Sequence, residues 1–214
     1  MTQRTTPIEK QFDKKGPKVV EALKRRHFDA YYCPTGEEAL KKVLSLIPKE
    51  DVVAWGGSAT LAQLGIIDKV RQTNPVIDRD AAASREESLE LMRRSLLCDT
   101  YLMSSNAISE DGQLYNIDGN GNRVAALVFG PKSVIVVAGM NKVTKTIEDA
   151  EARARYIAAP INVQRFENDN PCNLTGTCSD CLKPTSICAS MLRTRISRPA
   201  GKIKVVLVGE ELGF

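Results

Sequence analysis

The segment DVVAWGGSATL, residues 51–61, decides the fold class, because an apolar run, a glycine pair and a helix start follow one another directly. The run DVVAW (51–55) has the length and composition of a buried strand. Ser58 follows the two glycines, and serine is favoured where a helix begins, so residues 58–66 are expected to be helical. A strand that leads through a tight turn into a helix is typical of parallel α/β proteins.

The same order recurs along the chain. A helix over 18–28 is expected to begin at Gly16 and Pro17, and a helix over 146–160 is expected to end at Pro160. The remaining helices are expected at 36–47, 85–97 and 123–129, and the strands at 29–33, 51–55, 99–105, 133–139 and 202–210. The strands are apolar nearly throughout, which predicts an α/β fold with a mostly parallel sheet and helices on its faces. We expect one domain over 1–214, with a helical and strand portion at 1–50 and a cysteine-rich loop insertion at 168–192.

Composition excludes several functions. The chain has 214 residues, 43% of them hydrophobic, and 30 basic residues are dispersed among 26 acidic ones. With no basic stripe and few aromatic residues, nucleic acid is not an expected partner. Neither a signal peptide nor a membrane span is evident, so we expect a cytoplasmic protein that does not bind a membrane. The sequence contains no conventional motif for a nucleotide cofactor.

Three polar segments that contain glycine are expected at the carboxyl edge of the sheet, where α/β proteins bind ligands. Backbone N–H groups of glycines, hydroxyl groups and a lysine all suit a small anionic metabolite, either a carboxylate or a phosphate. Each segment alone is equally consistent with an ordinary turn or a solvated loop. The candidate anion-binding residues are Gly56, Gly57, Ser58, Ala59, Thr60, Asn120, Gly121, Asn122, Asn141 and Lys142.

Four of the six cysteines lie in CNLTGTCSDCLKPTSIC, residues 172–188, among residues that favour loops. In a reducing compartment, clustered cysteines indicate metal or redox chemistry before disulfides. Four thiolates suit zinc or an iron–sulfur cluster, and the spacing does not decide between them. Reduced surface thiols, or disulfides formed during purification, remain alternatives. The candidate metal ligands are Cys172, Cys178, Cys181 and Cys188.

Several motifs in their order along the chain resemble the LUD domain family of lactate-utilisation proteins. They are GGSATL (56–61), ISEDGQLYNIDGNGNRVA (108–125), VAGMNKVT (137–144), EARARYIAAPIN (151–162) and KVVLVGEELGF (204–214). The resemblance implies a fold similar to the ribose-5-phosphate isomerase, glucosamine-6-phosphate isomerase and CoA-transferase group. It also implies that residues 56–60 form an anion loop, that Glu110 and Asp111 lie near the reacting carbons, and that Lys142 contacts the substrate. The candidate catalytic residues are therefore Glu110, Asp111 and Lys142.

The resemblance further implies a subunit or accessory protein in the oxidation of lactate or a related small hydroxy acid. Its expected partners are oxidoreductase subunits that carry iron–sulfur clusters, and this association favours a cluster over zinc at the cysteines. A homo-oligomer is also left open. Two other functions stay open: a module that senses a metabolite or redox state, and an isomerase or acyl-transfer enzyme like the fold relatives.

Overall fold

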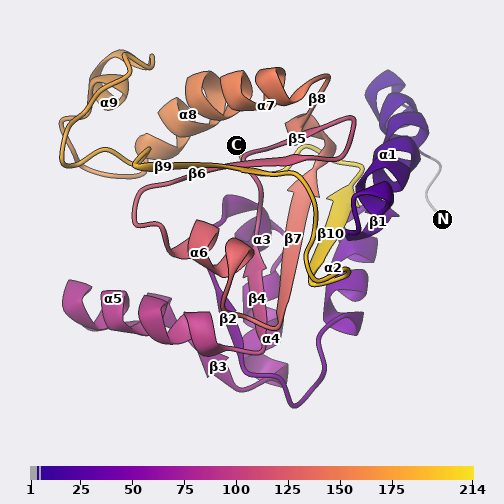
Figure 1. Ribbon diagram of the computed structural model, residues 1–214, viewed down its shortest axis with the longest axis horizontal. Helices are drawn as coiled ribbons and strands as arrows, with labels where there is room; N and C mark the ends of the chain where they lie inside the picture. The colour runs from indigo at the N-terminus through magenta and orange to yellow at the C-terminus, as the bar shows by residue number, and fades with distance from the viewer. Residues whose placement is uncertain (1–3, 5) are drawn as a thin grey trace.

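The computed structural model describes residue 4 and residues 6–214, and its centre is a six-stranded parallel sheet (Figure 1). The strands are parallel because the chain between successive strands of this sheet returns each time to the edge where the strands begin. This arrangement confirms the predicted α/β class. In spatial order the strands are β1 (Asp29–Cys33), β10 (Ile203–Val208), β7 (Ser133–Gly139), β4 (Thr100–Met103), β2 (Val53–Trp55) and β3 (Val76–Ile77).

Helices cover both faces of this sheet. The side chains of Val53, Trp55, Val137 and Val208 point to one face, where α2 (Gly36–Ser45), α3 (Ala59–Gln63) and α4 (Ile66–Thr73) pack on them. On the opposite face, α1 (Pro7–Arg25) and α6 (Asn122–Val128) pack on the alternate side chains of the same strands. Burial on both faces explains why the strands are apolar throughout.

A second, four-stranded sheet lies beside the carboxyl edge of the first (Figure 1). Its order is β8 (Val143–Thr144), β5 (Ala107–Ser109), β6 (Leu114–Asp118) and β9 (Ser190–Thr194). One helical segment covers it, comprising α7 (Ile147–Arg153), the π-helix η4 (Ala154–Ala158) and α8 (Ala159–Val163). The short connecting helices are η1 (Arg79–Ala81), α5 (Arg85–Arg94), η2 (Ser95–Leu97), η3 (Met140–Lys142) and α9 (Pro171–Thr175).

Several predicted helix boundaries are wrong. The helix expected over 58–66 stops at Gln63, because Gly65, at a φ of 63°, separates α3 from α4. Helix α1 begins at Pro7, because Thr6 and Glu9 form a reciprocal capping box there, and Pro17 lies inside the helix. Pro160 does not end its helix either. The π-helix η4 precedes it and replaces the usual α-helical hydrogen bonds with longer-range ones, so the helical segment continues to Val163.

The segments 1–50 and 168–192, which the sequence set apart, each contribute to one of the two sheets. From the 1–50 portion, β1 forms an edge of the parallel sheet while α1 and α2 pack on opposite faces. The 168–192 insertion carries α9 and the start of β9, and so joins the second sheet. The expectation of no signal peptide lies partly outside the described residues. Within the described residues, no helix combines the length and apolar character that crossing a membrane requires.

Candidate functional site

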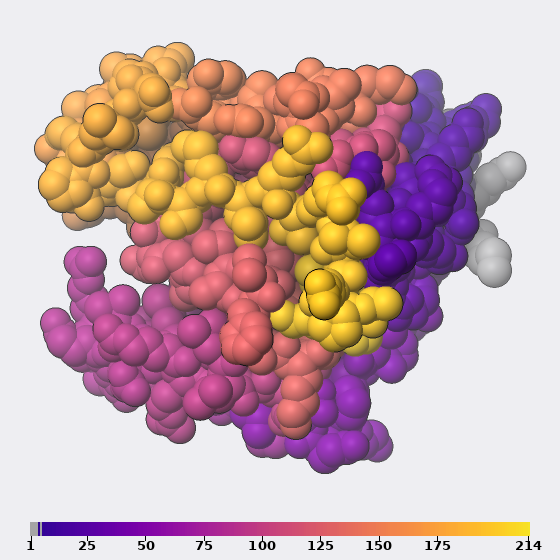
Figure 2. Space-filling model, viewed as in Figure 1, coloured from indigo at the N-terminus to yellow at the C-terminus, as the bar shows by residue number. Residues whose placement is uncertain are grey.

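A cavity of about 660 Å³ opens at the carboxyl ends of β2, β4 and β7. Figure 2 shows the surface hollowed between helix α5 and the segment that carries α9. Ser104 and Ser105 follow β4 into this space, and Lys142 reaches it at the end of η3, shortly after β7. The cavity therefore lies where the sequence predicted a ligand, at the edge where strands lead into helices.

Lys142 lies at the base of this cavity and is only 4% exposed. Its Nζ donates to Thr60 Oγ1 at 2.9 Å and to Ser104 Oγ at 3.0 Å. Within residues 4 and 6–214, no carboxylate forms an ion pair with it. A buried amine with only hydroxyl partners is ready to accept the negative charge of a ligand.

The surroundings of Lys142 lower its pKa from 10.5 to about 7. Burial is the largest cause, because the low-dielectric interior disfavours the ammonium form. The positive charges of Arg153 and Arg123 lower the pKa further. Arg153 is fixed beside the site by donating to the carbonyl oxygens of Asn106 at 2.6 Å and Asn141 at 3.1 Å. Lys142 therefore exchanges its proton near neutral pH, which suits acid–base chemistry.

The glycine pair makes room for two arginines. A Cβ atom on Gly56 would lie 2.4 Å from Arg123 Cγ, and one on Gly57 would lie 3.1 Å from Arg79 Nη2. Both arginine side chains thus pass directly over the loop and line the cavity. Any larger residue at position 56 would displace the Arg123 side chain. The role of these glycines is to admit cations as well as to form a tight turn.

The charge of the cavity wall is mainly positive. Its cationic residues are Arg79, Arg85, Arg123, Lys142 and Arg165, and its acidic residues are Asp118 and Glu167. Asp118 is already engaged, because its Oδ2 accepts from the backbone N–H groups of Arg123 at 2.8 Å and Val124 at 3.2 Å. The excess of cations over free carboxylates favours an anionic ligand.

The structure brings many of the predicted anion-binding residues together. The cavity wall includes Gly57, Ser58, Ala59, Asn120, Asn122 and Lys142. Thr60 contributes through its contact with Lys142, and Ser58 caps α3 by accepting from Leu61 N at 3.2 Å. Gly56, Gly121 and Asn141 lie outside the wall: Gly121 precedes α6 at a φ of 79°, and Asn141 Oδ1 accepts from Leu212 N at 3.1 Å.

Glu110 and Asp111 lie away from this cavity, in the turn between β5 and β6. Glu110 pairs with Lys145 at 2.8 Å and with Lys15 of α1 at 2.9 Å, and these lysines hold the pKa of its carboxyl below the ordinary value. Asp111 pairs with Arg26 and accepts from Gln113 Nε2 at 2.8 Å. Glu110 thus joins this turn to α1, and Asp111 joins it to Arg26, the residue that follows α1. Asp111 also accepts from the Ser109 hydroxyl group.

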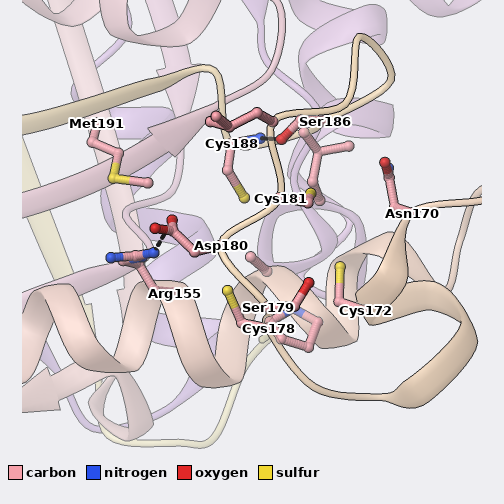
Figure 3. A pocket seen from close by; sticks show the side chains of 14 residues that line it. Arg155, Asn170, Cys172, Cys178, Ser179, Asp180, Cys181, Ser186, Cys188 and Met191 are labelled. Carbon is pink, nitrogen blue, oxygen red and sulfur yellow. Dashed lines mark hydrogen bonds and ion pairs between the residues drawn. The ribbon is translucent and has the colours of Figure 1, made fainter.

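The four clustered cysteines line a second, smaller cavity of about 130 Å³ (Figure 3). All four are free thiols and partly buried. Burial, and then the charges of Cys172, Cys178 and Cys181, raise the pKa of the Cys188 thiol to about 11. Among the described histidine, cysteine, aspartate and glutamate side chains, no three converge as the ligands of one metal ion would. The thiols thus surround a common space without meeting at a point.

The two cavities share a wall formed by Ala159, Ser186 and Ile187.

Several residues of the anion cavity were not predicted from the sequence, above all the arginines. Two of them could have been predicted from the sequence, because Arg123 ends the DGNGNR segment and Ser104 is the next-to-last residue of the predicted strand 99–105. Arg79 and Arg165 carried no such signal, since they come from segments that only the tertiary fold brings to the sheet edge.

Comparison with known proteins agrees with this architecture. A crystal structure of a DUF162 family protein from Deinococcus radiodurans is similar, with a TM-score of 0.54 and 11% sequence identity over 92% of this chain and 98% of the other. At that identity the likeness concerns the fold alone. No curated protein matches the chain. The family model of the LUD domain matches residues 16–208, nearly the whole chain, so this protein belongs to the LUD domain family.

Proposed function

We propose that the chain binds a small organic anion, a carboxylate or a phosphate, in the arginine-lined cavity, with Lys142 as the cation that contacts it. The observation that carries this proposal is the buried Lys142 amine, which has two hydroxyl partners and no carboxylate partner among the described residues. Binding an anion would supply the missing countercharge and recover part of the desolvation cost of the ammonium group.

Membership of the LUD domain family supports lactate or a related small hydroxy acid as the bound anion. In this proposal Lys142 acts in its ammonium form, as the cation that holds the carboxylate of the hydroxy acid. We propose that the chain serves such an oxidation as a subunit in the cytoplasm, beside oxidoreductase subunits that carry iron–sulfur clusters. Glu110 and Asp111 have no part in this proposal, because neither lines the cavity.

Isothermal titration calorimetry with L-lactate, glycolate, pyruvate and inorganic phosphate tests the proposal. Wild-type protein is expected to bind at least one of these anions, and Lys142→Met is expected to lose that binding. Lys145→Met is a matched control, since Lys145 is exposed and pairs with Glu110 outside the cavity. The proposal fails if Lys142→Met binds the same anions as tightly as the wild type does.

A further inference from the structure

The cysteine cavity is held in shape by hydrogen bonds that do not involve sulfur. Asn170 is only 1% exposed, and its side chain donates to Thr185 O at 2.9 Å and accepts from Thr185 Oγ1 at 2.9 Å. Gln164 Nε2, from the end of the helical segment, donates to Cys172 O at 3.1 Å. These bonds join the two ends of the insertion, so the four thiols face one space without a disulfide between them.

Cationic charge lies beside the thiols. Arg155, on the π-helix η4, lines the cavity against Cys178 and forms an ion pair with Asp180 (Figure 3). A metal centre that is held by four thiolates carries net negative charge, and a neighbouring guanidinium group stabilises it. Apart from Arg155 and Asp180, the wall consists of apolar and uncharged polar side chains and the cysteines themselves.

Four thiols around one space suit a cluster. All four line the same space of about 130 Å³ as free, partly buried thiols. In an iron–sulfur cluster the iron atoms and the bridging sulfides lie between the thiolates, so the four sulfurs need not converge on a single ion. Among the described side chains, no three do converge in that way.

We propose that Cys172, Cys178, Cys181 and Cys188 bind one iron–sulfur cluster within this chain, at the cavity that they line. The proposal does not depend on the anion cavity. It concerns a centre that this subunit carries itself, in addition to any cluster of a partner subunit.

Anaerobic reconstitution of the full chain with ferrous iron and sulfide tests this proposal. The wild type is expected to retain iron and acid-labile sulfide in equal amounts and to show visible charge-transfer absorption. The Cys178→Ser, Cys181→Ser double variant is expected to lose both. Cys98→Ala is the control, because it removes a buried thiol outside the insertion, and it is expected to retain the cluster.

A second measurement on wild-type protein avoids the risk that the variants misfold. Mass spectrometry after thiol alkylation is expected to show all four cysteines protected in the loaded chain and all four modified after chelation of the iron. Zinc without sulfide would overturn the proposal, as would no bound metal, or full iron and sulfide retention in the double variant. Each of these results leaves the calorimetric test of anion binding unaffected, so the two proposals fail separately.

Discussion

Lys142 is the residue at which the electrostatics of the site can be tested directly. On the proposed function, its ammonium form and not its neutral form binds the anion, and its pKa in the free protein is about 7. Anion affinity is therefore expected to weaken as the pH rises through about 7, by up to about tenfold per pH unit. Calorimetry between about pH 6 and about pH 9 measures this dependence. A flat affinity profile across that range would show that another cation determines binding.

The same residue makes stability depend on pH. Since the pKa of Lys142 is about 7 in the folded protein and 10.5 ordinarily, the unfolded chain binds more protons between these values. The contribution of Lys142 to the free energy of unfolding therefore rises as the pH increases from about 7 to about 10.5, by at most about 1.4 kcal/mol per pH unit. Below about pH 7 this contribution is constant. Urea denaturation at several pH values is expected to show this rise in Lys145→Met and its loss in Lys142→Met. Equal slopes in the two variants would contradict the burial of a titrating amine.

At the scale of elements, the turn between β5 and β6 docks on helix α1 through Gly112. This glycine has a φ of 88°, and a Cβ atom there would lie 2.6 Å from the backbone of Ala22 and Leu23. Gly112→Ala is expected to lower the free energy of unfolding by about 2 kcal/mol or more, through both strain and collision. Gly201→Ala is the control, because Gly201 has a φ of 75° with no atom near the added group. Equal losses in chemical denaturation of the two variants would rule out the collision with α1.

The carboxylates of the same turn serve this docking. Glu110→Gln with Asp111→Asn is expected to leave anion affinity unchanged and to lower the free energy of unfolding by up to about 1 kcal/mol per ion pair. Calorimetry and urea denaturation of one preparation measure both quantities. A loss of anion binding with stability intact would return these residues to the site and support the isomerase or acyl-transfer alternative.

The elements that the sequence predicted well are those with a strong local pattern. The strand at 133–139 is an unbroken apolar run, and the helix at 85–97 begins with a serine cap, so both were predictable. The start of α1 was not, because Gly16 and Pro17 are usual helix breakers. Glycine is needed at position 16 because the Tyr32 ring packs directly against the helix there. A Cβ atom on residue 16 would lie 2.3 Å from Tyr32 Cδ2. Strand β9 has no apolar run and forms only by pairing with β6.

The residues of the candidate site also differ in how well the sequence predicts their positions. Ser58 and Lys142 follow strands of the parallel sheet, and the rule for its carboxyl edge places them from sequence. Asn120 and Asn122 follow β6 of the second sheet instead, so the expectation that all three segments share one edge of one sheet was wrong for 118–123. Arg79, Arg85 and Arg165 reach the cavity from connections whose paths depend on the whole fold. The four cysteines were recognisable from their spacing alone, but only the structure shows that they surround a common space.

At the scale of the whole molecule, the two cavities lie on either side of one short stretch of chain. Ser186 and Ile187 belong to the cysteine-rich insertion, and Ile187 also packs closely on Gly119, which lines the anion cavity. A ligand that shifts this stretch on one side changes the shape of the cavity on the other. Comparing the anion dissociation constant of cluster-loaded and stripped protein measures the effect, and an unchanged constant would show that the stretch is rigid.

Thermodynamic linkage makes that effect reciprocal. If a cluster bound at the cysteines changes the affinity for the anion by some factor, the bound anion changes the affinity for the cluster by the same factor. If the proposed cluster is present, the shared wall of Ala159, Ser186 and Ile187 would let the supply of a metabolite decide how firmly the protein holds iron. Loss of that iron would in turn change the response to the metabolite.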